Sequence, residues 1–125
     1  MLLALVAAGC GGAKQAPTPP LVTRTATPTA AALCLNSDAF LVDAEGRQIT
    51  GSSPGGINFT VAFYQSRAAA AAALARRNSG YASTIAATVI DDSGNPPLHP
   101  GGKPMRLTHD ELATLRHCIE LRRPG

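Results

Sequence analysis

Residues 57–64 read Ile-Asn-Phe-Thr-Val-Ala-Phe-Tyr, and this segment sets the fold class. Large apolar side chains occupy every second position from Ile57 onward, with polar or small side chains between them. A period of two is typical of a strand that buries one face of a sheet. The segment therefore predicts a half-buried β-strand near the middle of the chain.

A helix is expected directly after this strand. Residues 67–78 include six consecutive alanines, and alanine has the highest helix propensity of all residues. Ser66 can cap the start of the helix, and Gly80 is a natural stop. Arg76 and Arg77 fall in the last turn, where cations complement the helix dipole. The small side chains would let this helix lie close against a sheet.

Further strands are expected on both sides of this unit. Residues 40–42 and 48–50 predict two short strands, which the turn residues 43–46 would join. Residues 83–90 predict one more strand. The connecting loops are then 51–56, 91–95 and 96–104.

The first helix of the domain is expected over residues 28–36. Thr27 can cap this helix, and Pro28 suits its first position because proline lacks the amide hydrogen that would go unpaired there. Leu33 and Cys34 are expected to face the core.

The last helix has the clearest start signal in the chain. Thr108 and Glu111 have the spacing of a capping box, and Leu107 can pack on Leu112 as a hydrophobic staple. Its apolar face is expected to carry Leu112, Leu115 and Ile119, with Cys118 beside it. Pro124 and Gly125 would end the helix.

These elements predict a single α+β domain over residues 28–125. We expect a small, mainly antiparallel sheet with the helices packed on one face. A domain of roughly 95 residues can bury one modest core. Aromatic residues make up 4% of the chain, so this core must consist mainly of Leu, Ile, Val and three Phe.

The net charge does not indicate nucleic-acid binding. The formal charge of the chain is +3, but Lys14 and Arg24 precede the predicted domain, which leaves nine Lys or Arg against eight Asp or Glu. A nearly neutral domain lacks the basic surface that contacts to phosphate require. Nucleic acid is therefore not an expected partner.

No motif for cofactor or metal chemistry is found. The glycine-rich residues 51–56 lack the lysine and the following helix of a phosphate-binding loop. Residues 91–95 lack the glycine position and the closing glutamate of a calcium loop. The remaining metal-ligand types also have no recognised spacing; they are His99, His109, His117, Met105, Asp91 and Asp92.

Catalytic residues are not indicated either. No serine lies in a GxSxG sequence, and no group of acid, base and nucleophile can be assigned. We therefore expect no catalytic, cofactor-binding or metal-binding residues, and we do not expect an enzyme.

Residues 5–10 read Leu-Val-Ala-Ala-Gly-Cys, an apolar run that ends in small residues and a cysteine. This segment resembles the lipobox of bacterial lipoproteins, although Ala7 stands where that family usually has leucine. The resemblance implies that residues 1–9 are a signal peptide and that Cys10, carrying a diacylglyceryl group, becomes the N-terminus. Two acyl chains suffice for stable attachment to a membrane. The alternative is an ordinary apolar N-terminus with a chance cysteine.

The first cation is Lys14, so the basic start of such a signal is expected upstream of Met1. Residues 10–27, rich in Pro, Thr and Gly, are expected to form an extended linker between the lipid and the domain. Lipidation of Cys10 would leave Cys34 and Cys118 to form a disulfide, which persists outside the cytoplasm. Two unpaired buried thiols are the alternative.

The resemblance implies a location on the extracytoplasmic face of the cell membrane, attached by the lipid anchor. We expect an accessory or interaction domain whose partner is an envelope protein or polymer. The alternative function is a carrier or sensor of a small molecule or metal ion. A minor envelope enzyme is the least favoured function.

Overall fold

The structure is a computed structural model that describes residues 21–77 and 80–124. Its elements follow one another in this order: β2 (Leu21–Thr25), α1 (Pro28–Ser37), β3 (Leu41–Glu45), β4 (Gln48–Ser52), β5 (Asn58–Phe63), α2 (Arg67–Arg77), β6 (Ala82–Ile85), β7 (Thr88–Asp91), α3 (His109–Ile119) and β8 (Glu120–Pro124). Within the described residues, no helix has the length and apolarity that crossing a bilayer requires.

The main sheet has the strand order β3-β4-β5-β7-β6, and all neighbouring strands are antiparallel. The predicted central strand is β5, and its alternating residues from Ile57 to Phe63 are buried as expected. Ile49, Val61 and Ile90 form a buried row across three adjacent strands. The α+β class and the antiparallel sheet are thus confirmed.

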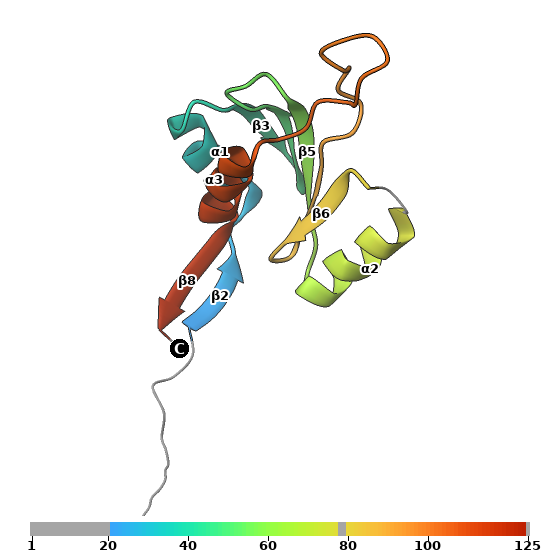
Figure 1. The fold of residues 1–125 in the computed structure, drawn as a ribbon. Helices are drawn as coiled ribbons and strands as arrows, with labels where there is room; N and C mark the ends of the chain where they lie inside the picture. Colours follow the sequence, from blue (N-terminus) through green and yellow to red (C-terminus); the bar gives the residue numbers. More distant parts are fainter. Residues whose placement is uncertain (1–20, 78–79, 125) are drawn as a thin grey trace, which may run out of the picture.

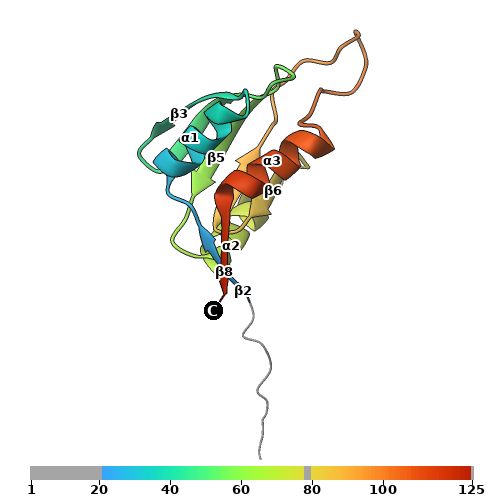
Figure 2. The ribbon, with the colours of Figure 1, turned by 90° about the vertical axis from the view of Figure 1, so that its left-hand side faces the viewer.

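The helices lie on both faces of this sheet, which corrects the expectation of one covered face. Helices α1 and α3 bury Leu35, Leu115 and Ile119 in the larger core, together with Val61 and Ile90. Helix α2 packs Ala70 and Ala73 on Val89, whose neighbour Ile90 points into that larger core. Figure 2 shows α1 and α3 in front of the sheet, with α2 behind it.

The topology explains this second layer. Strands β5 and β6 are both antiparallel to β7, which lies between them, so they are parallel to each other. A connection between parallel strands must cross a face of the sheet, and α2 crosses the face opposite α1 and α3 (Figure 1). Residues 85–90 are all buried, as expected for a strand covered on both faces.

The single strand expected over residues 83–90 is two strands, β6 and β7. A two-residue turn at Ala86 and Ala87 joins them, and Ala86 adopts a positive φ of 50°. The Thr88 hydroxyl donates to the Ile85 carbonyl at 2.6 Å and stabilises the turn. The prediction missed this turn because it contains none of the Gly, Asn or Asp residues that normally mark such a conformation.

Part of the predicted linker is a strand. Residues 21–25 form β2, which pairs antiparallel with β8. The last helix therefore ends at Ile119 and not at Pro124 as predicted, because residues 120–124 pair as a strand with β2. Two hydrogen bonds join the base of this two-stranded ribbon to the domain: Ala26 N to Ile119 O at 2.8 Å, and Ala87 N to Thr25 Oγ1 at 3.0 Å. The ribbon extends away from the main sheet (Figure 1). Linker composition cannot reveal a pairing partner at the opposite end of the chain.

The expected disulfide joins α1 to α3. Cys34 and Cys118 are bonded, with their Cα atoms 5.5 Å apart. The caps of both helices are also as predicted: Thr27 accepts from Ala30 N, and Thr108 forms the full capping box with Glu111. Leu33, however, is 67% exposed rather than in the core. The buried face of α1 instead carries Ala31, Ala32 and Leu35.

Candidate functional site

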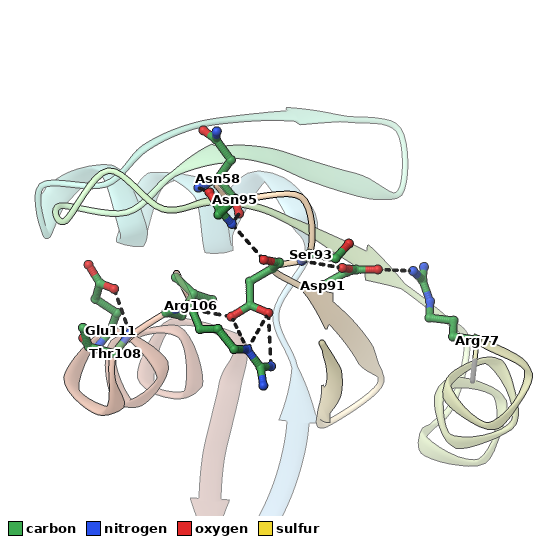
Figure 3. Close-up of polar contacts among 10 residues, drawn as sticks. Asn58, Arg77, Asp91, Ser93, Asn95, Arg106, Thr108 and Glu111 are labelled. Carbon is green, nitrogen blue, oxygen red and sulfur yellow. Dashed lines mark hydrogen bonds and ion pairs between the residues drawn. The ribbon is translucent and has the colours of Figure 1, made fainter. Parts of the chain in front are cut away.

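A polar network around the loop between β7 and α3 is the first candidate site (Figure 3). The Asp92 carboxylate is buried and accepts hydrogen bonds from the Arg106 guanidinium, with Nη2 and Oδ1 3.1 Å apart. It also accepts from the backbone N–H of Leu107 at 2.9 Å. These contacts hold the residues before α3 against the end of β7.

Asn95, three residues after Asp92, also holds this loop in place through hydrogen bonds of its side chain. Its side chain accepts from Asn58 N at 2.8 Å and donates to Asn58 O at 2.9 Å and to Asp92 O at 2.8 Å. It thereby replaces one rung of the β-ladder beside β5, beyond the point where β7 ends. Because its partners are backbone groups and its amide is buried, Asn95 is a structural residue.

Two carboxylates at the edges of the network are held ionised by hydrogen bonds. Burial raises the pKa of Asp91, but hydrogen bonds from Ser93 and the charge of Arg77 outweigh burial, so its pKa lies below the ordinary value. Burial likewise raises the pKa of Glu111, but bonds from Thr108, Ser53 and Gly55 bring it below the ordinary value.

A general acid or base at neutral pH needs a pKa moved toward 7. The pKa values of Asp91 and Glu111 move in the opposite direction. Asp91 accepts from the backbone N–H of Ser93 in the loop after β7, and Glu111 accepts from that of Gly55 in the loop between β4 and β5. The geometry of this network therefore serves to stabilise loops, and it does not resemble a set of catalytic groups.

The second candidate is a groove of about 710 Å³ between α1, α3 and the start of β8. Small apolar residues and the disulfide line it, with polar side chains from α3 and β8 at its rim. The lining residues are Ala26, Ala30, Cys34, Ala113, Arg116, His117, Cys118, Glu120 and Leu121. We refer to this surface as the α1–α3 groove.

Charge in the α1–α3 groove is partly neutralised. Arg116 Nη1 lies 3.0 Å from Glu120 Oε2, and the Glu120 side chain is only 8% exposed. His117 is exposed beside this pair. Such a surface can bind an apolar group with a polar end, but it holds no arrangement of nucleophile and base.

The three histidines lie on separate segments. His99 is in the loop after β7, His109 is the first residue of α3, and His117 lies in its last turn and lines the α1–α3 groove. Met105 and Asp92 are near the start of α3, and Asp92 is engaged by Arg106.

In the described parts of the chain, metal-ligand side chains come together at one place, formed by Cys34, Asp38 and Cys118. Asp38 Oδ2 lies 3.9 Å from Cys118 Sγ. Both sulfurs belong to the disulfide, so they have no thiolate to offer a metal ion. This cluster is therefore a carboxylate beside a cystine.

The sequence analysis did not find the α1–α3 groove. Its signal is a pair of small residues one turn from larger groove residues: Ala30 before Cys34, and Ala113 before His117. These alanines leave space only because the two helices lie side by side, which the sequence does not show.

Cys10, the predicted lipidation site, lies outside the described residues. No protein-family model, no curated protein and no solved structure matches this chain.

Proposed function

We propose that this chain is a bacterial lipoprotein, anchored through Cys10 to the extracytoplasmic face of the cell membrane. The observation that carries the proposal is the segment 5–10, an apolar run that ends in Ala-Gly-Cys. The chain has three cysteines, and the disulfide uses two of them. Cys10 is the cysteine outside this bond, as lipidation would require.

The disulfide supports a location outside the cytoplasm. Disulfides persist in oxidising compartments and are rare in the reducing cytosol. The Cys34–Cys118 bond links residues 84 apart in sequence. Closing a loop of this length stabilises the folded state by about 4.5 kcal/mol in the chain-entropy model. A small domain that depends on such a bond is suited to the cell envelope.

The domain itself acts as an accessory or interaction module in this proposal. Its carboxylates stabilise loops, and the α1–α3 groove offers a concave surface with an apolar floor. Binding to an envelope protein or polymer requires only such a surface. No reactive group is needed for this function.

Mass spectrometry of the protein from the native membrane fraction tests the anchor. Trypsin cleaves after Lys14, so the mature chain should give a peptide of residues 10–14 with a diacylglyceryl group on Cys10. Cys34 and Cys118 should be recovered in one linked pair of peptides. The Cys10→Ala variant is the control, and it should lack the acyl mass and be washed from the membrane fraction by high salt, which leaves the lipidated chain in place. An unmodified Cys10 in the membrane-fraction protein would contradict the proposal.

A further inference from the structure

The positive charge of this protein is concentrated in the ribbon of β2 and β8. The described residues contain ten Lys or Arg and eight Asp or Glu. Three of the basic residues (Arg24, Arg122 and Arg123) and one acid (Glu120) belong to the ribbon, which leaves seven of each sign elsewhere. The rest of the described chain is therefore neutral, and the ribbon carries the excess.

The single acid of the ribbon, Glu120, pairs with a base outside it. Glu120 accepts from Arg116 of α3 at 3.0 Å, and its side chain is 8% exposed. Arg24 is exposed. Arg116, a base outside the ribbon, thus pairs with Glu120, and the formal charge of the ribbon itself is +2.

The strand register places cationic and apolar residues on one face. Arg24 is opposite Leu121, and Val22 is opposite Arg123. Residues directly opposite in an antiparallel pair share a face, as do alternate residues along a strand. These four positions therefore lie on the same face of the ribbon.

This mixed face lies opposite the face that contacts the β6–β7 turn, and its Leu121 also lines the α1–α3 groove. Thr25 belongs to the other face, and its hydroxyl accepts from Ala87 N in the β6–β7 turn at 3.0 Å. Arg24, on the mixed face, is exposed. Arginine next to apolar side chains is the composition of protein surfaces that bind at the membrane interface.

The position of the ribbon in the chain points to a membrane as its partner. The far end of the ribbon is the pair Leu21 and Pro124, and the ribbon extends from the domain in both ribbon views (Figures 1 and 2). Cys10 precedes Leu21 by eleven residues, which can span at most about 40 Å when fully extended. If Cys10 is lipidated, this end of the molecule is held close to the bilayer.

Resting on that lipidation, we propose that the β2–β8 ribbon binds anionic phospholipids through Arg24 and Arg123, the two arginine positions of the mixed face. Arginine forms paired hydrogen bonds with phosphate oxygens. Each basic residue at an anionic membrane surface strengthens binding by about fivefold. The ribbon would then be a second attachment point that orients the domain, with the main sheet directed away from the membrane.

The test uses the full chain with Cys10→Ala, so that binding does not depend on the lipid anchor. Co-sedimentation is measured with vesicles of phosphatidylcholine alone and of phosphatidylcholine mixed with phosphatidylglycerol. We expect binding to the mixed vesicles, weakening as salt is added because salt screens charge. Changing Arg24 and Arg123 to glutamine should weaken this binding by about 25-fold.

A charge-matched control separates the ribbon from net charge. The variant R67Q/R76Q removes two exposed cations outside the ribbon and should bind the mixed vesicles like the Cys10→Ala parent. Thermal melting of each variant checks that it is folded.

Equal loss of binding in the ribbon and control variants would overturn the proposal. Equal binding of the Cys10→Ala chain to neutral vesicles would do the same, as would no binding at low salt. Tighter binding to soluble polyglutamate than to vesicles would assign the ribbon to an anionic polymer instead. The acyl mass is measured separately, on Cys10 of the native protein. Failure of the vesicle experiment is therefore distinct from failure of the proposed anchor.

Discussion

Ala39 has a backbone conformation that suits glycine better than alanine. It follows the C-cap of α1, is exposed, and has a φ of 70°. The next residue, Phe40, donates its N–H to Leu35 O at 3.1 Å and completes the helix end. A left-handed residue at this position is common, but in a residue with a Cβ atom it costs about 1 kcal/mol.

Ala39→Gly is therefore expected to raise the free energy of unfolding by about 1 kcal/mol. For a domain of this size, the corresponding increase in Tm is about 4 to 8 °C. Ala71→Gly, at an exposed site within α2, is the control and should lower stability by about 1 kcal/mol. Calorimetry distinguishes the two. A decrease in Tm for Ala39→Gly would show that the Cβ atom of Ala39 is not a source of strain.

Glu111 links the stability of the domain to pH. It is buried, and its carboxylate accepts from Thr108 N and Gly55 N, both at 2.9 Å. Its folded pKa is below its ordinary value of 4.5. The contribution of the ionised group is therefore present above the pKa of the unfolded chain, and it is lost as pH falls through the lower, folded pKa.

Urea unfolding of the Glu111→Gln variant should show less loss of stability between about pH 5 and pH 2 than the unchanged chain. At neutral pH, this variant should be about 1 to 2 kcal/mol less stable, because a buried acceptor of two backbone N–H groups becomes weaker. Asp43→Asn, at an exposed position on β3, is the control and should keep the pH dependence. If Glu111→Gln lost as much stability at low pH as the unchanged chain, Glu111 would be excluded as the source of that loss.

At the scale of elements, two asparagines replace missing rungs of the sheet. Asn95 pairs with both backbone groups of Asn58, where β7 has ended. On the outer edge of β3, Asn36 accepts from Val42 N at 2.9 Å and donates to Val42 O at 3.1 Å. The second contact also covers part of an edge strand that could otherwise pair with another chain.

These two contacts have the same chemistry but different burial, so they form a matched pair. Asn95→Ala should cost about 2 to 3 kcal/mol because it removes a buried side chain that makes three hydrogen bonds, one of them the buried bond to Asp92 O. Asn36 is exposed, so Asn36→Ala should cost about 1 kcal/mol, with water replacing the side chain. Hydrogen exchange at the Asn58 and Val42 amides, together with urea unfolding, measures both effects. Equal costs would show that burial is not what distinguishes the two sites.

At the scale of the whole molecule, the disulfide is the strongest single link between distant parts of the chain. It joins α1 to α3, the two helices on the larger core. The total stability of a domain is about 5 to 15 kcal/mol, so a contribution of about 4.5 kcal/mol is a large share. The smaller core, where α2 packs on Val89, lies outside this link.

The variant C34A/C118A should lose about 4.5 kcal/mol of unfolding free energy relative to the oxidised protein. Urea unfolding with and without a reductant checks this, because reduction of the unchanged chain should give a similar loss. Cys10→Ala, which retains the disulfide, should unfold at the same urea concentration as the unchanged chain. A reduced protein as stable as the oxidised one would assign the stability to the core alone.

Local sequence signals predicted the elements that depend on a few neighbouring residues. Strand β5 followed from alternation, α2 from its alanines and Ser66, and α3 from the Thr108 capping box. Each signal acts within one or two turns or along one strand. The turn at Ala86 was missed because an alanine with positive φ leaves no mark in the composition.

The sequence by itself determined the α+β class and the N-terminal caps of α1 and α3. It predicted the bond between Cys34 and Cys118 only through the lipobox resemblance at Cys10, and the structure contains that bond. Only the tertiary structure decided that α2 covers the second face, that residues 21–25 pair with β8, and that a groove forms between α1 and α3. The physical reason is the distance along the sequence over which each interaction acts. Propensity and capping act between near neighbours, whereas pairing and packing are chosen among segments that meet only after the chain has folded.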